Sequence, residues 1–428
     1  MESPRNSTRR RLTLRRLFVI IGLLLAPELA TGQNRALDPR RIPKGQLADS
    51  VHVYLMTMGQ GDDLYELFGH NAIWVHDPSR AVDSVYNWGV FSFEQPHFIW
   101  RFLQGRNDYY MMPFRLDETM AEYRQHNREV WAQELNLTEA EKQKLIEFVH
   151  WNALPQNSAY RYNYYLDNCS TRVRDALDLA TGGQIRPQLK AIRTEETYRS
   201  HSLRLMQGMP AIVSGVELLL GEKADVKLSA DEASFLPVQL MNYLTPLKLD
   251  GGARPLFKNS FVVNQATRDP EPAAQPPLWL WFLPVSLVLS GLIAWLGVSA
   301  VHGRRQRLAA FFFAFIAGVI GVLGVIIVFL VGFTDHSAAH RNENVFMLNP
   351  LWLVVALIAP AMMLRPVVRR YLSRLIQTCG ALGLLAVVLH LIGMGRQANW
   401  DAIVLVLPVE LALVLALTWP RKADQPAV

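Results

Sequence analysis

The chain has 428 residues, half of them hydrophobic, only two cysteines and a formal net charge of +6. The positive charge is explained by arginines in the N-terminal segment and between apolar runs, so it does not indicate a nucleic-acid-binding protein. The sequence contains no glycine-rich phosphate loop, zinc-ligand spacing or internal repeat, so we expect no cofactor and no metal.

The first 32 residues have the pattern of a secretory signal. Five arginines over 9–16 come first, an apolar run over 17–26 follows, and small residues at 30–32 suit cleavage by a signal peptidase. The apolar run is too short for a membrane-spanning helix. We therefore expect a signal peptide or a signal anchor over residues 1–32, which directs the following segment out of the cytoplasm.

Mixed polar and apolar residues over 33–265 predict an exported globular domain. Within it, the hydrophobic pattern predicts three strands and one short helix near the beginning. The strands are expected at 51–55, 70–76 and 82–89, and the short helix at 62–68. A capping-box pattern at 138–141 predicts the start of a further helix, which we interpret as structural.

Two residues in these strands are candidates for a catalytic site. His70 directly follows Gly69 at a strand start, where its ring can face a cleft. A histidine in such a place is more often an ordinary polar residue, but it is also the base that a cysteine acyl-transfer site requires. Asn87 on the neighbouring strand is our candidate for the group that orients the imidazole. Four residues compete with Asn87 for this role: Asp62, Asp63, Glu66 and His76.

Cys169 is the only cysteine of the exported part, and it stands where a helix should begin. Asp167 and Asn168 are typical of helix N-caps, and Gly182 and Gly183 end the apolar pattern that follows. A cysteine in the first turn faces unpaired N–H groups and the positive end of the helix dipole, so we expect its pKa to be lowered. The same N–H groups are suited to hold an oxyanion. The alternative is a small, buried and inert cysteine.

Two neighbours of Cys169 are candidates for supporting roles. Tyr164 belongs to a tyrosine cluster that we expect to form core and cleft wall, with one hydroxyl available to help hold an oxyanion. Arg172 lies one turn from Cys169. Three roles are open for it: pairing with Asp175 or Asp178 along the helix, favouring the thiolate, or meeting a phosphate.

The composition changes at residue 266. A proline-rich linker at 266–276 precedes a region over 277–420 for which we expect five membrane spans. The apolar runs cover 277–300, 308–333, 350–364, 375–394 and 403–419. Arginines follow the first and third runs, and Arg421 and Lys422 follow the fifth. The positive-inside rule therefore places these loops in the cytoplasm and the globular domain on the opposite side.

Three segments carry a resemblance to a known family: FGHNAIWV at 68–75, VYNWGVFSF at 85–93 and DNCSTRVRD at 167–175. They resemble the N-terminal domain of the Lnb family, which are bacterial membrane proteins associated with lipoprotein N-acylation. FTDH at 333–336, NEN at 342–344 and NPL at 349–351 resemble the loop between the spans of that family. The order of a histidine strand and then an Asn-Cys helix also resembles the permuted papain-like, NlpC-like arrangement of lecithin:retinol acyltransferase relatives.

The resemblance implies an α+β papain-like extracytoplasmic domain, permuted and NlpC-like, followed by an all-α transmembrane bundle. It implies a multi-pass protein of the bacterial inner (cytoplasmic) membrane with its N-terminal domain in the periplasm. Cys169 and His70 would be catalytic, with Asn87 as the third residue and Tyr164, Asp167, Asn168 and Arg172 supporting them. The implied partners are a phospholipid acyl donor, a lipoprotein acceptor and the membrane, with no nucleic acid.

The loop over 334–349 should lie on the same side as the exported domain and approach its cleft. Asp335, His336 and His340 suggest a metal site, but a further ligand is not evident and short polar loops need such residues to satisfy their ends. We instead expect His336 and Asn344 to contact a lipid head group or the incoming lipoprotein. A plain interfacial loop is the alternative.

The leading hypothesis is a cysteine acyltransferase that moves a fatty acyl chain from phospholipid, through a Cys169 thioester, to the N-terminal amine of lipoproteins. A membrane-anchored thiol peptidase or amidase acting on cell-wall peptides is the alternative enzyme. A third class is an envelope protein whose cysteine is inert. Fast reaction of the thiol with iodoacetamide near neutral pH favours either enzyme over the third class.

Overall fold

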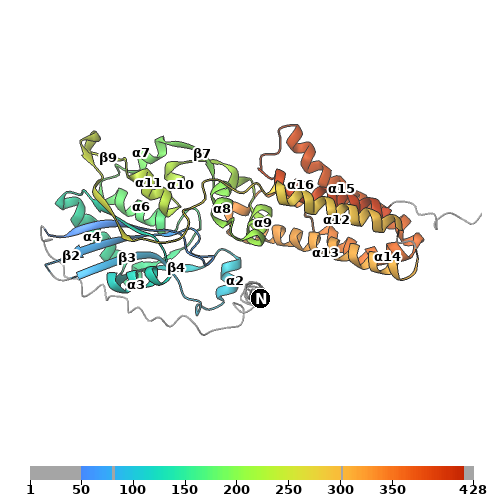
Figure 1. The fold of residues 1–428 in the computed structure, drawn as a ribbon, viewed down its shortest axis with the longest axis horizontal. Coiled ribbons are helices and arrows are strands. Elements are labelled where there is room, and N and C mark those ends of the chain that lie inside the picture. The colour runs from blue at the N-terminus through green and yellow to red at the C-terminus, as the bar shows by residue number, and fades with distance from the viewer. Residues whose placement is uncertain (1–49, 80–81, 300–301, 419–428) are drawn as a thin grey trace, which may run out of the picture.

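A computed structural model of the chain describes residues 50–79, 82–299 and 302–418, with a β-sheet domain at one end and a bundle of long helices at the other (Figure 1). The expected signal segment, residues 1–32, lies outside the described residues. The two parts follow the change of composition near residue 266, because the charged residues lie mainly in the first part and the long apolar runs in the second.

The sheet domain is built on seven strands in the order β11-β5-β1-β2-β3-β4-β6, and every neighbouring pair is antiparallel. The three strands expected from the sequence are confirmed and lie side by side as β1, β2 and β3. The strands of the sheet are β1 (His52–Met58), β2 (His70–Asp77), β3 (Val82–Val90), β4 (Asp108–Arg115), β5 (Val130–Leu135), β6 (Ala159–Arg161) and β11 (Phe257–Asn264).

Apolar side chains bury both faces of this sheet. Ile73 and Trp88 lie on the face that helices α4 (Glu139–Asn152) and α6 (Cys169–Ala180) cover. Trp74 lies on the opposite face, which α3 (Leu116–Gln125) covers. Because both faces are covered, the central strands are almost continuously hydrophobic. The sheet therefore offers a rigid support for residues at the strand ends.

Further short elements complete the sheet domain, and α8 and α9 lie between the sheet and the bundle (Figure 1). The helices are α2 (Phe98–Leu103), α5 (Pro155–Ser158), α7 (Arg186–Ala191), α8 (Tyr198–Met206), α9 (Pro210–Leu219), α10 (Ala230–Ala233) and α11 (Pro237–Leu244). Two small sheets pair β7 (Arg193–Thr197) with β8 (Lys227–Ser229), and β9 (Lys248–Leu249) with β10 (Arg254–Pro255).

The prediction of a short helix at 62–68 is wrong, because this segment forms turns. Its backbone closes on Glu66, whose carbonyl accepts hydrogen bonds from the N–H groups of Gly61 (3.0 Å) and Gly69 (3.0 Å). The Glu66 carboxylate is buried and accepts from Nη1 of Arg128 (3.1 Å). This buried ion pair holds the segment in a loop, which the local hydrophobic pattern does not reveal.

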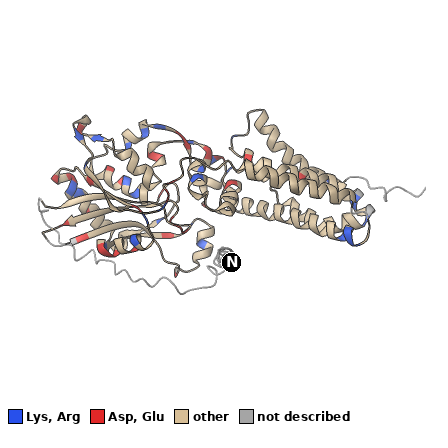
Figure 2. Cartoon of the chain, viewed as in Figure 1, with Lys and Arg blue, Asp and Glu red and all other residues tan. Residues whose placement is uncertain are grey.

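Among the described residues, the second part has five helical segments that are long and apolar enough to cross a membrane, which confirms the expected number of spans. The segments are Trp279–Ser299, Gly303–Phe333, Glu343–Leu364, Tyr371–Leu391 and Trp400–Thr418. They contain the helices α12 (Trp279–Ser299), α13 (Gly303–Phe333), α14 (Leu351–Leu364), most of α15 (Pro366–Leu391) and α16 (Trp400–Thr418). Lysines and arginines gather at the end of the bundle away from the sheet domain (Figure 2). This distribution is the one that the positive-inside rule requires if the sheet domain lies outside the cytoplasm.

A seam of amide side chains fastens the sheet domain to the outer loops of the bundle. Nδ2 of Asn342 donates to the carbonyls of Leu218 (3.1 Å) and Leu219 (3.0 Å), and Nε2 of Gln397 donates to Leu220 (2.9 Å). Nδ2 of Asn344 also donates to Leu218 (2.9 Å). We call these contacts the joint. The carbonyls come from the end of α9, where a helix leaves acceptors without partners of its own.

Candidate active site

Cys169 is the first residue of α6, as the N-cap pattern predicts. Oδ1 of Asn168 accepts hydrogen bonds from the N–H groups of Ser170 (2.9 Å) and Thr171 (3.0 Å), and Oγ1 of Thr171 accepts from the Asn168 N–H (2.8 Å). Nδ2 of Asn168 donates to the carbonyls of Tyr164 (2.9 Å) and Phe235 (2.8 Å). Asn168 therefore fixes where α6 begins and, with it, the position of the thiol.

The thiol of Cys169 is partly buried, and its surroundings act in opposite directions. Burial raises its pKa, and this effect exceeds the opposing effect of the backbone N–H groups of Asn71, Ser170 and Cys169 itself, and of the Arg128 charge. The expected lowering of this pKa is therefore wrong. The helix terminus does favour a thiolate, but the apolar cluster in which the side chain packs favours the neutral thiol more strongly.

His70, the first residue of β2, is hydrogen bonded to Asn87 on β3. Nε2 of His70 lies 3.0 Å from Oδ1 of Asn87, and Nδ2 of Asn87 donates to the carbonyl of Val85 (2.9 Å). Because the amide nitrogen is engaged with a carbonyl, its oxygen faces the ring and Nε2 must carry the proton. Burial lowers the pKa of His70 to about 4, although the bond to Asn87 raises it. The neutral ring therefore keeps a lone pair on Nδ1.

The strand ends bring the thiol to the same place as the histidine. The N–H that faces the Cys169 sulfur belongs to Asn71, the residue after His70. Continuing the β2–β3 register from the pair of Ala72 and Asn87 puts Gly89 beside His70, and a Cβ on Gly89 would lie 3.7 Å from Cβ of Cys169. Gly89 has a φ of +97° and lies where the β3–β4 register shifts between Trp88 and Val90, so the strand is irregular where the helix start approaches.

Tyrosines form one wall around Cys169. Burial is the main cause that raises the pKa of Tyr160, Tyr162 and Tyr164, and the charge of Cys169 raises it further. All three hydroxyls are therefore protonated near neutral pH. Within the described part of the chain, the buried hydroxyls of Tyr160 and Tyr164 have no hydrogen-bond partner. They are free to donate to an oxygen of a bound substrate, as the sequence suggested for Tyr164.

Arg172 pairs with Asp167, so of the roles left open for it, pairing with Asp175 or Asp178 is not the one observed; its neighbour Arg174 pairs with Asp175 (2.8 Å). Its Nε and Nη2 donate to the two carboxylate oxygens of Asp167 at 2.5 and 2.6 Å. Its guanidinium also lies 4.3 Å from the centre of the Tyr160 ring. The geometry of the helix start directs Arg172 back toward Asp167, the residue before the N-cap, where it forms a bidentate ion pair. This pair supports the tyrosine wall.

The competitors of Asn87 are engaged elsewhere. Glu66 binds Arg128, His76 lies 2.7 Å from Asp83, and Asp62 pairs with Arg268 (3.2 Å). Asp63 accepts from the Tyr65 hydroxyl (3.0 Å). Of the five candidates, Asn87 is therefore the one that the structure joins to His70.

Arg128 is a residue that sequence reasoning missed. It is buried, its charge disfavours protonation of His70 and favours the Cys169 thiolate, and it lies over the Tyr123 ring at 4.7 Å. Its Nη2 has no hydrogen-bond partner among the described residues. A single arginine between a helix and a strand carries no local signal, so only the fold reveals its place beside the site.

The loop over 334–349 lies on the sheet-domain side of the bundle and binds it. Asp335 accepts from Nε of Arg106 (3.0 Å), and Nε2 of His336 lies 3.1 Å from the carbonyl of Phe102. Asn344 is fully buried in the joint, so its amide is not presented to a head group or to an acceptor. No group of three or more metal-ligating side chains occurs among the residues that the structure describes.

Comparison with known families agrees with this division into two parts. Residues 45–204 match the Lnb N-terminal periplasmic domain, and residues 277–422 match the Lnb transmembrane domain. No curated protein and no solved structure matches the chain. The two matched regions together span well over half of the sequence. The chain therefore belongs to the Lnb family, with a periplasmic N-terminal domain followed by a transmembrane domain.

Proposed function

We propose that this protein is a membrane-bound cysteine acyltransferase that moves a fatty acyl chain from phospholipid, through a Cys169 thioester, to the N-terminal amine of lipoproteins. The observation that carries the proposal is the set of three polar groups at one end of the sheet. The first is the Cys169 thiol at the start of α6. The second is the imidazole of His70, whose neighbour Asn71 directs its backbone N–H at the sulfur. The third is the amide of Asn87, which orients the imidazole. Nucleophile, base and orienting group are what covalent acyl transfer requires.

The first half-reaction transfers the acyl group to sulfur. As the Cys169 sulfur attacks the ester carbonyl, its proton passes to Nδ1 of His70, and the carbonyl oxygen becomes an oxyanion. Nearby donors for this oxyanion are the backbone N–H groups of Cys169 and Asn71, which face the sulfur, and the hydroxyl of Tyr164. The ester bond then breaks, and the leaving lysophospholipid oxygen takes the proton from His70.

The second half-reaction returns the enzyme to its starting state. The acceptor amine attacks the thioester carbonyl, His70 takes a proton from the amine, and the bond to sulfur breaks to give an amide. The proton on His70 then returns to the Cys169 thiolate. The raised pKa of this thiol, which burial causes, makes it a group that is readily reprotonated once the product forms.

We also infer that the sheet domain has the permuted papain-like, NlpC-like arrangement. The support is the chain order, in which the histidine strand β2 precedes the cysteine helix α6, and the packing of α6 on β2 and β3. The antiparallel sheet and the helix that carries the nucleophile are the parts that such an arrangement needs.

The five spans support a lipid donor. Moving a chain of about sixteen carbons into water costs roughly 0.8 kcal/mol per CH₂, or on the order of 12 kcal/mol. A site at the membrane surface avoids this cost because the chain stays in an apolar environment. The lipoprotein acceptor follows from the association of the Lnb family with lipoprotein N-acylation.

The test is intact-mass analysis of the purified protein incubated with phospholipid vesicles. We expect a fatty acyl adduct on Cys169 that hydroxylamine removes and that a lipoprotein N-terminal peptide carries away as an amide. If instead no adduct forms and a cell-wall peptide is cleaved with water as acceptor, the alternative peptidase or amidase function is correct.

A further inference from the structure

Helix α2 is apolar except at Arg101, and none of its residues is buried. Five of its six residues are hydrophobic. Ile99, Trp100 and Phe102 are each about half exposed, at 50%, 53% and 54%. Contiguous apolar surface of this kind marks a site that another apolar body covers.

The position of α2 identifies that body as the membrane. The Trp100 ring lies 5.9 Å from the ring of Phe329, which belongs to the span α13, and the Asp335 N–H donates to the carbonyl of Gln104 (2.9 Å). Gly105 has a φ of +69°, and a Cβ there would lie 3.3 Å from the His336 ring, so glycine permits this close approach. Because α13 ends at Phe333, α2 lies at the depth where the span leaves the hydrocarbon (Figure 1).

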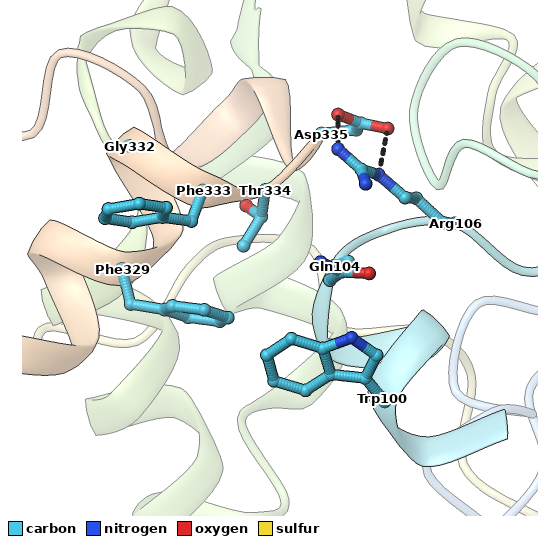
Figure 3. A pocket seen from close by; sticks show the side chains of 8 residues that line it. All are labelled: Trp100, Gln104, Arg106, Phe329, Gly332, Phe333, Thr334 and Asp335. Atoms are coloured by element: carbon cyan, nitrogen blue, oxygen red, sulfur yellow. Dashed lines mark hydrogen bonds and ion pairs between the residues drawn. The ribbon is translucent and has the colours of Figure 1, made fainter. Parts of the chain in front are cut away.

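A cavity of about 440 Å³ opens between α2 and the end of α13 (Figure 3). Rings of Trp100, Phe329 and Phe333 form one part of its lining, and the ion pair of Arg106 and Asp335 forms another. Arg161 also reaches Asp335 (3.4 Å), so two guanidiniums share one carboxylate. An apolar wall beside a cationic rim fits a phospholipid, whose acyl chain and phosphate need these two environments.

A continuous row of aromatic rings leads from α2 to the candidate nucleophile. The ring of Phe98 lies 6.0 Å from Phe91, Phe91 lies 5.2 Å from Tyr109, and Tyr109 stacks on Tyr162 at 4.1 Å. Tyr109, Tyr162 and Cys169 then pack together against the main core. We call these rings the aromatic row. Its rings join α2, beside the end of α13, to the residues that pack with Cys169.

We propose that α2 inserts into the outer leaflet and that α2 and the end of α13 form a lipid port, through which a phospholipid acyl chain passes along the aromatic row to Cys169. The last step rests on the proposed function, because it needs an acyl chain to react at Cys169. The insertion of α2 does not rest on it and is tested separately.

Insertion is measured with a spin label at position 99. In the full-length Cys169→Ser protein, Ile99→Cys is labelled and the protein is placed in phosphatidylglycerol and phosphatidylcholine vesicles. Cys379 is fully buried and stays in place. Treating the Cys169→Ser protein, which lacks the cysteine at 99, with the label checks that Cys379 does not react.

We expect dissolved oxygen to relax the label at position 99 more strongly than a water-soluble nickel chelate does. A matched label at Trp151→Cys, which replaces an equally exposed side chain at the end of α4, should show the reverse preference. If the nickel chelate relaxes the label at position 99 as strongly as the label at position 151, α2 is not inserted and the proposal is overturned.

The port is measured by the rate of acyl-enzyme formation in otherwise native protein. With long-chain phospholipid in vesicles, Ile99→Glu should lower this rate about tenfold or more, because a carboxylate replaces apolar surface that contacts lipid. With a short, water-soluble ester such as nitrophenyl butyrate, the rate should be unchanged. Trp151→Glu, which alters an equally exposed side chain (55%), should leave both rates unchanged.

The outcomes separate the two proposals. Equal loss with both donors would show a structural effect of Ile99→Glu and overturn the port, as would unchanged rates with vesicles. If the native protein forms no acyl-enzyme with any donor, the proposed function and the port fail together, whereas the spin label still decides whether α2 is inserted.

Discussion

Nε2 of His70 donates to Oδ1 of Asn87 over 3.0 Å, and the amide of Asn87 is held in this orientation by the carbonyl of Val85. The two residues lie on adjacent strands, two positions apart in register. This geometry selects the tautomer in which Nδ1 is the free base. Asn87 therefore orients the imidazole because its own amide is fixed by a backbone carbonyl.

Removing the thiol or the base should abolish acyl transfer without unfolding the protein. We expect no adduct with Cys169→Ala and a loss of about 10² to 10⁴-fold in acylation rate with His70→Gln, the range of general-base catalysis. Intact mass and thermal unfolding are measured together. Cys379→Ala is the control, because Cys379 lies in the bundle and should not affect the rate. Native acylation rates in Cys169→Ala would rule out the thioester.

Changing Asn87 should alter the pH dependence as well as the rate. Asn87→Ala should lower acylation because the imidazole loses its orientation, with an effect of about tenfold. Asn87→Asp should place a negative charge beside the ring and raise the pKa of His70 from about 4, because an opposite charge favours the imidazolium. The acid limb of the pH–rate profile should then move to higher pH. An unmoved limb in Asn87→Asp would mean that His70 is not the base.

The pH dependence of thiol alkylation should distinguish a neutral pair from an ion pair. Burial raises the pKa of Cys169 and lowers that of His70, so the resting site is a neutral thiol beside a neutral imidazole. Iodoacetamide should therefore react slowly at pH 6 and faster as the pH rises above the usual thiol range of about 8.5. Fast alkylation near neutral pH, which a lowered pKa would have given, thus does not separate this enzyme from a protein with an inert cysteine. A rate plateau that extends down to pH 5 would instead reveal a preformed thiolate–imidazolium pair.

His70 should also make folding less stable in acid. Its folded pKa of about 4 lies below the usual 6.5, so the unfolded chain binds more protons between these values. The free energy of unfolding should then fall as the pH drops from 6.5 toward 4, and His70→Gln should remove part of this slope. Denaturant unfolding of both proteins at several pH values measures the difference, and identical slopes would contradict the burial of a neutral ring.

The ion pairs beside the joint should contribute strongly to stability. The buried Arg199 donates to Glu217 (2.9 Å), to Asp225 (2.6 Å) and to the carbonyl of Leu220 (2.9 Å). Arg199→Met should cost about 3 to 5 kcal/mol, because it leaves two buried carboxylates without their partner. Lys227→Met breaks an exposed pair with Glu195 and should cost less than about 1 kcal/mol. Thermal unfolding in detergent compares the two, and equal shifts would contradict the role of burial.

The loop residues His336 and Asn344 should behave differently from each other. Asn344 is buried in the joint, so Asn344→Ala should weaken both half-reactions together through loss of the joint. His336 contacts a backbone carbonyl of α2 from the surface but does not line the cavity of the port, so we expect His336→Ala to weaken transfer to the lipoprotein more than formation of the acyl-enzyme. Single-turnover measurements of the two steps separate these effects, and equal losses in His336→Ala would exclude an acceptor role.

Short-range sequence patterns predicted the elements better than the contacts between them. The strand that begins at His70, the helix that begins at Cys169 and the five spans follow from periodicity, capping and hydropathy, which act over a few residues. The pairing of Arg172 with Asp167 and the position of Arg128 depend on tertiary packing, so local patterns did not predict them. The pKa of Cys169 was mispredicted for the same reason, because burial is decided by residues distant in the chain.

The joint has a consequence for the handling of the isolated periplasmic half. Leu203 and Val213 of this half pack against Leu278 and Phe282 at the start of the bundle, beside the carbonyls that the joint satisfies. A protein cut before residue 277 would expose these side chains together with the apolar surface of α2. Water would then solvate the carbonyls at little cost, but the apolar groups would drive self-association. We therefore expect the severed half to precipitate or oligomerise unless detergent is present, and the intact chain to be the better subject for crystallisation.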